Sequence, residues 1–284
     1  MALFNVHFFK EKTRKIDLEQ LIAHFEHIEG IHIEMDDKSV RFKYVQPKLQ
    51  YDALFIITPK SQVPDIYRLN PRYLDLNFHL EMNILTPEYV AKQIFEMVKT
   101  ICDTFGFAIY NEMFEDVLVF KMDVLLKVYQ MLKGAYIEKN PMLLSEHHRL
   151  PKEEVSAILR YLDDHVELQE YYKDLETYVP KYHFLTTEKK KLVLGIEWKE
   201  HTLTVFPPYI DFVFYRLGNE IKVIDTHELY PEIDKFLLDV PGFIKGTKVM
   251  HKKTAKKVYH IMKKYKFTKI THTFTKESLK RILD

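Results

Sequence analysis

The sequence predicts an α+β protein with mixed or antiparallel sheets, packed helices and two domains. Segments with apolar residues at every second position stand beside segments with a helical apolar period, and the two kinds do not alternate strictly. The length of 284 residues favours two domains over one. Hydrophobic residues at 46% and charged residues at 29% are ordinary values for a folded globular chain.

The first domain is predicted over residues 1–145, as an acidic α+β domain. A helix is expected within residues 15–30, because Asp17 is a good N-cap and Gly30 follows the end of the helical pattern. Strands are expected at 31–35, 40–45, 51–58, 74–84, 107–112 and 115–120. Further helices are expected at 86–106 and 122–136, the first of them capped by Thr86 with Pro87 in its first turn.

The second domain is predicted over residues 146–284, after a stretch without a clear period. Helices are expected at 151–165 and 167–178, and strands at 181–187, 191–198, 202–206 and 209–224. Gly218-Asn219 divides the last of these into a hairpin. Three more helices are expected: one from Pro231 to about 240, one over 252–267 and one over 275–283.

The charge distribution is uneven along the chain. Residues 243–284 contain 13 Lys and Arg but only two acidic residues, whereas the preceding 242 residues contain 29 basic and 39 acidic residues. Such asymmetry indicates an anionic partner or an internal docking surface. The basic C-terminal segment (243–284) is therefore the strongest functional lead in the sequence.

Lysine dominates this segment, and its mobile point charge suits contacts with phosphate groups rather than the reading of bases. The expected binding residues are Lys245, Lys248, Lys253, Lys256, Lys257, Lys264, Lys276, Lys280 and Arg281. The leading hypothesis is a non-enzymatic cytosolic interaction protein whose basic C-terminal module docks an acidic protein or nucleic acid. The alternative is a solvated helix face whose charges are balanced by acidic residues of the same chain.

Residues 74–84 alternate strictly, with apolar side chains at even positions and polar side chains at odd positions. Successive side chains of a strand point to opposite faces, so His79 and Glu81 share a face. A second His-x-Glu pair, His32 and Glu34, lies on an expected strand that is predicted to be a neighbour in the sheet. If the two strands are neighbours, these four residues suit a metal ion, and the alternative function is a metal-dependent hydrolase or nuclease.

The polar side of the same strand also suggests a small-molecule binding groove formed by Asp75, Asn77, His79 and Glu81. A simpler explanation is that an antiparallel strand with one solvated face needs polar residues at alternate positions. A further candidate for metal-assisted hydrolysis is Glu197-x-Lys199, which lacks a clear second carboxylate nearby.

The segment Phe206–Tyr215 is rich in apolar residues that do not alternate, so both of its sides need cover. A central strand explains this pattern, and self-association through the segment is the alternative. The single cysteine, Cys102, excludes an intrachain disulfide, and we find neither a secretory signal nor an apolar run of membrane-spanning length. We therefore expect a cytoplasmic protein without a membrane span and without a cofactor.

Overall fold

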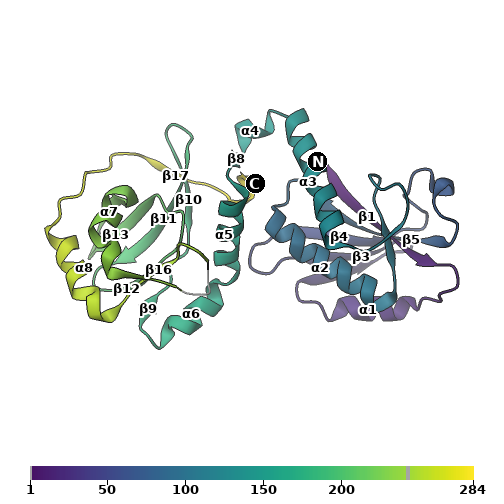
Figure 1. Cartoon of the computed structure of the whole chain (residues 1–284), viewed down its shortest axis with the longest axis horizontal. Coiled ribbons are helices and arrows are strands. Elements are labelled where there is room, and N and C mark those ends of the chain that lie inside the picture. The colour runs from purple at the N-terminus through teal and green to yellow at the C-terminus, as the bar shows by residue number, and fades with distance from the viewer. Residues whose placement is uncertain (1, 241–243) are drawn as a thin grey trace. The chain divides into compact units, whose positions relative to one another are not determined.

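The computed structural model describes residues 2–240 and 244–284, and it confirms the α+β class (Figure 1). The chain divides into two compact units, unit 1 (Met1–Ser145) and unit 2 (Glu146–Asp284). Each unit has a hydrophobic core of its own. Residue 243, the first of the predicted basic segment, lies outside the described residues.

Unit 1 is built on one seven-stranded sheet. Its strands are β1 (Leu3–Glu11), β2 (Ile31–Met35), β3 (Val40–Val45), β4 (Asp52–Ile57), β5 (Tyr73–Asn83), β6 (Ala108–Tyr110) and β7 (Leu118–Val119). Their order in the sheet is β2-β3-β4-β5-β1-β6-β7, and every neighbouring pair is antiparallel. The predicted strands of residues 1–145 are therefore present.

Three helices pack against one face of this sheet, which we call the core face. They are α1 (Leu18–Glu26), α2 (Glu88–Phe105) and α3 (Met122–Lys139), and a short 3₁₀ turn, η1 (Ile66–Arg68), precedes β5. Phe25 of α1 stacks on Phe42 of β3, with ring centroids 4.2 Å apart. Phe4 of β1 contacts Phe95 of α2 at 5.7 Å and Tyr129 of α3 at 5.2 Å. The aromatic residues of unit 1 thus join the helices to the sheet.

The helix ends follow the expected capping chemistry at two of three points. Asp17 caps α1, since its Oδ1 accepts a hydrogen bond from the Glu19 N–H at 2.9 Å. Gly106 ends α2 with a φ of +65°, a left-handed conformation that glycine adopts without strain. The predicted cap of α2 is wrong, because the N-cap position is Pro87. Thr86 is buried one residue earlier, where its carbonyl oxygen accepts a hydrogen bond from Lys133 Nζ at 3.0 Å.

β1 was not predicted, yet it lies inside the sheet between β5 and β6. Phe4, Val6 and Phe8 point to the core face and are buried. His7 points to the other side, which we call the open face, and lies opposite His79 of β5. The missed strand therefore adds a histidine to the polar side of β5.

The long predicted strand contains a β-bulge. Phe78 pairs with Phe8 of β1 and Asp75 pairs with Phe9, so Leu76 and Asn77 have no partner on β1. Asn77 has a φ of +53°, and its N–H donates to Asp75 Oδ1 at 3.0 Å. Because the bulge contains two extra residues, the odd positions of β5 stay on the open face along its whole length.

Unit 2 contains two larger sheets and a two-stranded pair. Its strands are β8 (His148–Arg149), β9 (Thr177–Tyr178), β10 (His183–Thr187), β11 (Leu192–Lys199), β12 (Leu203–Phe206), β13 (Phe212–Leu217), β14 (Glu220–Asp225), β15 (Leu237–Asp239), β16 (Lys248–Met250), β17 (Phe274–Lys276) and β18 (Ile282–Leu283). The sheet orders are β14-β13-β11-β10-β17, β15-β16-β12-β9 and β18-β8. Parallel and antiparallel pairs both occur in each of the two larger sheets, so these are mixed, whereas the β18-β8 pair is parallel.

The helices around these sheets are α5 (Lys152–Asp163), α6 (His165–Lys173), α7 (Thr226–Ile233) and α8 (Lys252–Lys264). A four-residue helix, α4 (Leu143–Glu146), lies at the boundary of the units, and unit 2 has two 3₁₀ turns, η2 (Asp234–Phe236) and η3 (Leu279–Arg281). The predicted start of α7 at Pro231 is wrong, because Asp225 caps a helix that begins at Thr226.

The apolar segment Phe206–Tyr215 contributes to the core of unit 2. Phe206 and Val213 are fully buried, and Trp198 contacts Phe206 with ring centroids 5.3 Å apart. β13 has β14 on one side and β11 on the other, as a central strand requires. Asp211 Oδ2 accepts a hydrogen bond from the Leu194 N–H at 2.8 Å, which satisfies the carboxylate within this apolar segment. The segment thus packs against its own chain.

The predicted helix over 275–283 is wrong. This segment forms β17, the η3 turn and β18, which we together call the C-terminal strap (residues 274–284). β17 pairs with β10, and β18 pairs with β8 at the start of unit 2. Ile282 and Leu283 are buried, so tertiary pairing overrides the helical pattern of the segment. Among the residues that the structure describes, no helix is long and apolar enough to cross a bilayer.

Candidate anion-binding surface

Helix α8 has one buried side and one basic side. Ala255, Val258 and Met262 are buried against the core of unit 2. At about 100° per residue, the basic side chains occupy an arc of about 140° on the opposite side. We call this the α8 basic face; it comprises Lys252, Lys253, Lys256, Lys257, His260, Lys263 and Lys264. All seven are exposed.

Most of these cations have no acidic partner. Lys253, Lys256, Lys257, Lys263 and Lys264 form no ion pair with any residue that the structure describes. Like charges on successive turns repel one another, since residues three and four apart are neighbours on a helix surface. The α8 basic face is therefore a concentrated, uncompensated positive surface.

Three basic residues of the segment do have acidic partners within unit 2. Lys248 pairs with Asp234. Lys252 Nζ lies 3.6 Å from Glu176 Oε2, but both side chains are about four-fifths exposed, so this pair contributes little. The third is Arg281, on the C-terminal strap. Lys245, which was also predicted to bind the partner, is exposed and precedes β16.

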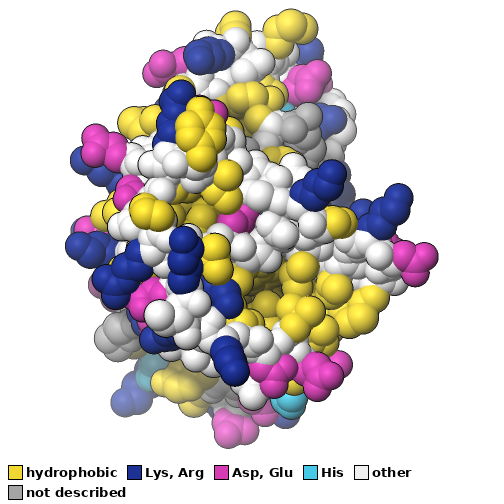
Figure 2. Space-filling view, turned by 90° about the vertical axis from the view of Figure 1, so that its right-hand side faces the viewer, with side chains coloured by type: hydrophobic (Ala, Val, Ile, Leu, Met, Phe, Trp, Pro, Cys, Tyr) yellow, Lys and Arg dark blue, Asp and Glu magenta, His cyan; other side chains and the backbone are white. Residues whose placement is uncertain are grey.

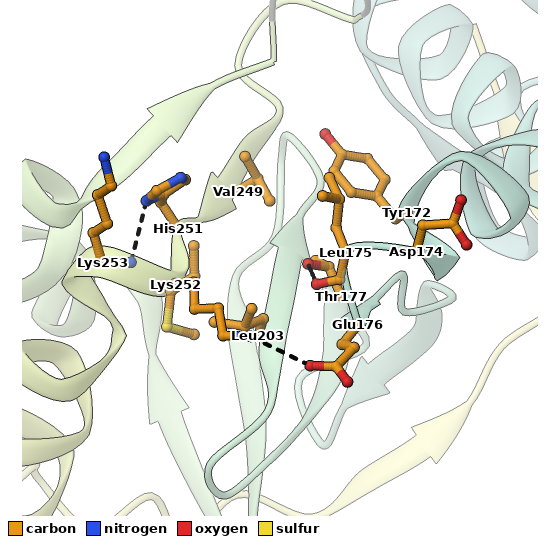
Figure 3. Close-up of a pocket in the computed structure, with 11 residues that line it drawn as sticks. Tyr172, Asp174, Leu175, Glu176, Thr177, Leu203, Val249, His251, Lys252 and Lys253 are labelled. Carbon is orange, nitrogen blue, oxygen red and sulfur yellow. Dashed lines mark hydrogen bonds and ion pairs between the residues drawn. The ribbon is translucent and has the colours of Figure 1, made fainter.

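A cavity of about 660 Å³ lies beside the N-terminal end of α8 (Figure 3). Asp174, Glu176, Lys252 and Lys253 line it together, so positive and negative side chains are mixed there. His251 Nδ1 accepts a hydrogen bond from the Lys253 N–H at 3.2 Å, which caps the helix. This end of α8 is thus largely satisfied, and the free charges lie along the helix and toward its C-terminal end.

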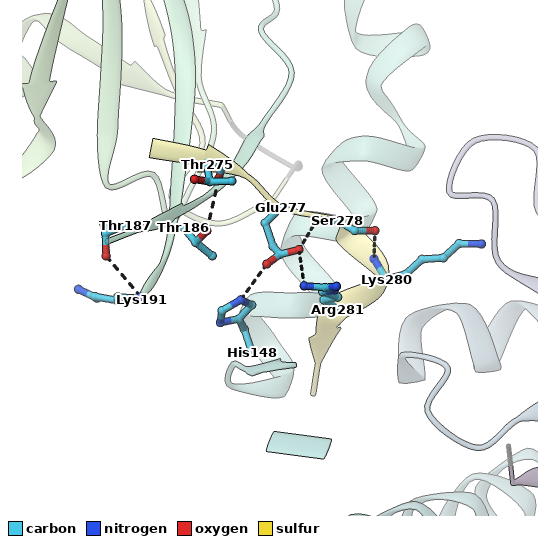
Figure 4. Close-up of polar contacts among 9 residues, drawn as sticks. All are labelled: His148, Thr186, Thr187, Lys191, Thr275, Glu277, Ser278, Lys280 and Arg281. Carbon is cyan, nitrogen blue, oxygen red and sulfur yellow. Dashed lines mark hydrogen bonds and ion pairs between the residues drawn. The ribbon is translucent and has the colours of Figure 1, made fainter. Parts of the chain in front are cut away.

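Lys276, Lys280 and Arg281 lie on the C-terminal strap, on a different side of unit 2 from α8 (Figures 1 and 4). Glu277 occupies the centre of this region, 3.3 Å from His148 Nε2 and 3.7 Å from Arg281 Nη1. Burial alone would raise the pKa of the Glu277 carboxyl. The Ser278 N–H, His148 and Arg281 together have a larger effect in the opposite direction, so the pKa is lowered. This cluster fastens the strap. The predicted basic residues therefore form two groups rather than one surface.

The acidic residues that offset the basic end are not concentrated in unit 1. Residues 1–145 hold 17 Lys and Arg against 20 Asp and Glu, whereas residues 146–242 hold 12 against 19. The charge asymmetry therefore lies largely within unit 2. Not every face resembles the α8 basic face: Figure 2 shows one on which basic and acidic side chains are interspersed among hydrophobic patches.

A shallow hollow of about 450 Å³ adjoins the α8 basic face. Phe236, Lys256, Lys257 and His260 are among the residues that line it. Lys257 Nζ lies 5.8 Å from the centroid of the Phe236 ring, and Lys235 Nζ lies 5.3 Å from it. Cation–π attraction of this kind holds two lysines beside one ring. Lys235 extends the positive surface beyond α8, and its isolated place in the sequence gave no signal of this.

The two His-x-Glu pairs do not meet at one site. His32 and Glu34 on β2 share the open face with His79 and Glu81 on β5, but β3 and β4 lie between them. Three strand spacings amount to about 14 Å, too far for a shared metal ion. The prediction that these strands are neighbours is therefore wrong. Among the described residues, no group of three or more His, Cys, Asp or Glu side chains could hold a metal.

His79 instead belongs to a buried histidine pair. The rings of His7 and His79 lie 5.2 Å apart between centroids, and both residues are 3% exposed. His79 Nε2 lies 3.1 Å from Glu81 Oε1. Burial, and secondarily the neighbouring His79, lowers the pKa of His7 to about 4. The imidazole of His7 is therefore held in its neutral form near neutral pH.

The connection between β4 and β5 accounts for part of the cover on the open face. Its Val63 is buried, and the Asn70 N–H donates to Asp116 Oδ1 at 2.9 Å. Burial raises the pKa of Tyr110, with further contributions from Glu112, Asp65 and Asp116. Asp65 thus lies close to Tyr110 of β6, which is paired with His7. The odd positions of β5 are partly enclosed rather than fully solvated.

The residues of the predicted small-molecule groove mostly form contacts within the fold. Asp75 and Asn77 bond to each other within the bulge, and His79 is buried beside His7. Glu81, about one-third exposed, is bonded to His79. Three of the four side chains are therefore engaged: Asp75 accepts from the backbone of Asn77, and His79 and Glu81 contact each other.

Glu197 and Lys199 lie at the end of β11, where β13 runs parallel to it. The Arg216 Nε–H donates to Glu197 Oε1 at 2.8 Å. This ion pair joins the two strands and supplies the partner that the Glu197 carboxylate needs. The arrangement resembles a structural cross-strand pair more than a metal site.

No protein-family model, curated protein or solved structure matches this chain. The functional argument therefore depends on the chain's own surfaces.

Proposed function

We propose that this protein binds an anionic macromolecule through the α8 basic face. The observation that supports the proposal is the set of five lysines on one side of α8 that lack acidic partners among the described residues. The buried side of α8 is committed to the core of unit 2, so the helix is held in place with its charges outward. Because the helix is already held in place, binding a polyanion orders the lysine side chains but not the backbone that carries them.

Heparin, a soluble polyanion, provides a direct test. The variant Lys253→Glu/Lys256→Glu/Lys257→Glu should lose most of its retention on heparin at low salt, because three exposed charges are reversed. The affinity of the unaltered protein should fall by at least about tenfold between about 50 and 200 mM salt if several anionic groups are engaged. An affinity that does not change with salt would contradict the proposal.

A matched control changes net charge by the same amount elsewhere. The variant Lys12→Glu/Lys38→Glu/Lys60→Glu reverses three exposed lysines of unit 1. It should retain nearly the full heparin affinity, since those lysines lie outside the α8 basic face. Equal losses in the two triple variants would show that net charge alone governs binding, and the proposed site would be rejected.

A further inference from the structure

The edge of the five-stranded sheet in unit 2 lies beside the end of α8. β14 is the last strand of that sheet and pairs only with β13 among the described residues. A groove of about 530 Å³ separates β14 from the segment that follows α8, residues 265–270. We call it the β14 groove. Its floor includes Tyr215, Ile224 and Met262, all buried.

The turn of the hairpin determines which backbone groups of β14 face this groove. Gly218 and Asn219 form a two-residue turn, and Gly218 has a φ of +55°, as a type II′ turn requires. Leu217 and Glu220 are then a hydrogen-bonded pair, and bonded positions alternate along the strand. Ile221 and Val223 therefore direct their N–H and C=O groups away from β13. No other backbone hydrogen bond engages either residue within the described parts of the chain.

The rest of the groove wall is basic. Lys222 comes from β14, Lys263 and Lys264 from α8, and Lys266 and Lys269 from the segment that follows. All five are exposed, and none of them forms an ion pair with a described residue. The Thr268 N–H donates to Glu228 of α7 at 3.0 Å, which fastens this wall in position. The groove thus combines open strand-pairing groups with uncompensated positive charge.

We infer that the β14 groove binds an extended acidic peptide segment of a partner protein, which adds to the sheet as a strand beside β14. This inference rests on the proposed function and names the class of partner. An added strand satisfies the outward groups of Ile221 and Val223. Its carboxylates lie between lysines on both walls, so charge complementarity selects an acidic sequence.

A single-stranded nucleic acid fits these observations less well. Bases need exposed aromatic faces for stacking. Tyr265 is 38% exposed, but its ring packs against Phe267 with centroids 4.6 Å apart. A nucleic acid also leaves the edge of β14 unpaired.

The decisive experiment uses the full chain and a fluorescent peptide of alternating glutamate and valine with blocked ends. Fluorescence anisotropy compares this peptide with the same sequence N-methylated at every residue, which keeps the charge but leaves no main-chain N–H on either edge to pair with a strand. We expect N-methylation to weaken binding by at least about tenfold, since it removes several main-chain hydrogen bonds. Equal affinity of the two peptides would overturn the inference.

Two variants localise the effect to β14. Ile221→Pro removes an outward N–H while leaving the bonds to β13, a position at which edge strands accept proline. It should weaken peptide binding several-fold more than Ile221→Ala, which keeps the N–H. If the proline variant fails to fold, the N-methylated peptide alone decides the matter.

Binding of heparin and of oligothymidylate distinguishes a failure of the β14 groove from a failure of the proposed function. If heparin binds but N-methylation has no effect, the α8 basic face stands and the β14 groove is rejected. If oligothymidylate binds more tightly than the acidic peptide and Lys266→Glu/Lys269→Glu abolishes its binding, the groove accepts nucleic acid instead. If heparin does not bind at all, the proposed function itself fails.

Discussion

Strand β5 of unit 1 and helix α8 of unit 2 are both amphipathic, but the polar side of β5 is partly buried and the polar side of α8 is exposed. On β5, His79 is 3% exposed and lies against His7, whereas the lysines of α8 are all exposed. Periodicity shows which residues share a side, but it does not show whether another part of the chain covers that side. A polar side thus becomes a buried pair of histidines in one unit and an exposed cationic surface in the other.

The largest effect is expected on the core face of β5. Phe78→Ala removes a ring that contacts Phe8, Phe25, Phe42 and Phe55. Unit 1 should lose about 3–5 kcal/mol of unfolding free energy, through lost burial and the cavity left behind. The rate at which a thiol reagent reaches buried Cys102 reports on the opening of this unit. An unchanged rate would show that the Phe cluster contributes little to the stability of unit 1.

His7 of β1, which lies against the polar side of β5, should make unit 1 sensitive to acid. His7 has a pKa of about 4 when folded and about 6.5 when unfolded, so the unfolded chain binds a proton more readily. Stability from this residue is complete above pH 6.5 and should fall by about 3 kcal/mol as the pH drops toward 4. Denaturant titrations of unit 1 across this range measure the loss.

The matched variants for this effect are His7→Gln and His32→Gln. The first should flatten the dependence of stability on pH between 6.5 and 4. The second alters an exposed histidine of β2 and should leave that dependence unchanged. Parallel profiles for the His7 variant and the unaltered protein would refute the assignment of the proton to His7.

Truncating a buried side chain on the hydrophobic side of α8 should lower the unfolding free energy of unit 2, but by less than Phe78→Ala lowers that of unit 1. Val258 is fully buried, and Val258→Ala should cost unit 2 about 2 kcal/mol. The fluorescence of Trp198, the one tryptophan of the chain, reports on unit 2 during denaturant unfolding. A loss below about 0.5 kcal/mol would mean that α8 is attached only loosely.

The smallest effect on stability is expected on the basic face of α8. Lys256→Gln should change the unfolding free energy of unit 2 by less than about 0.5 kcal/mol, because the side chain is exposed and unpaired. The same change should weaken heparin binding measurably. A marked stabilisation would indicate that repulsion among the lysines, rather than partner binding, is their main energetic consequence.

The sequence predicted the strong local signals and missed those that depend on distant pairing. The predicted helix over 252–267 is confirmed as α8, although it ends at Lys264, and the Gly218-Asn219 hairpin is confirmed. β1 was overlooked although Phe4, Val6 and Phe8 alternate with polar residues in the manner of β5. Only the sheet order places His7 beside His79 and separates the two His-x-Glu pairs.

The candidate site was predictable in part. The lysines of α8 follow from composition and helical spacing, whereas Lys222 and Lys235 join the basic surface from elements distant in the sequence. The C-terminal strap was misjudged because the residues that pair with it lie at the start of unit 2 and in β10. Periodicity within a segment contains no information about such partners.

The pairing of β18 with β8 affects how the chain folds during its synthesis. Unit 1 has all its strands once residues 1–145 have emerged from the ribosome, so it is free to fold early. The pairing of β8 in unit 2 is complete only after residues 282 and 283 have emerged, because they pair with residues 148 and 149. During much of translation, unit 1 can therefore be folded while the apolar segments of unit 2 are still exposed. Protection by chaperones matters most in that interval.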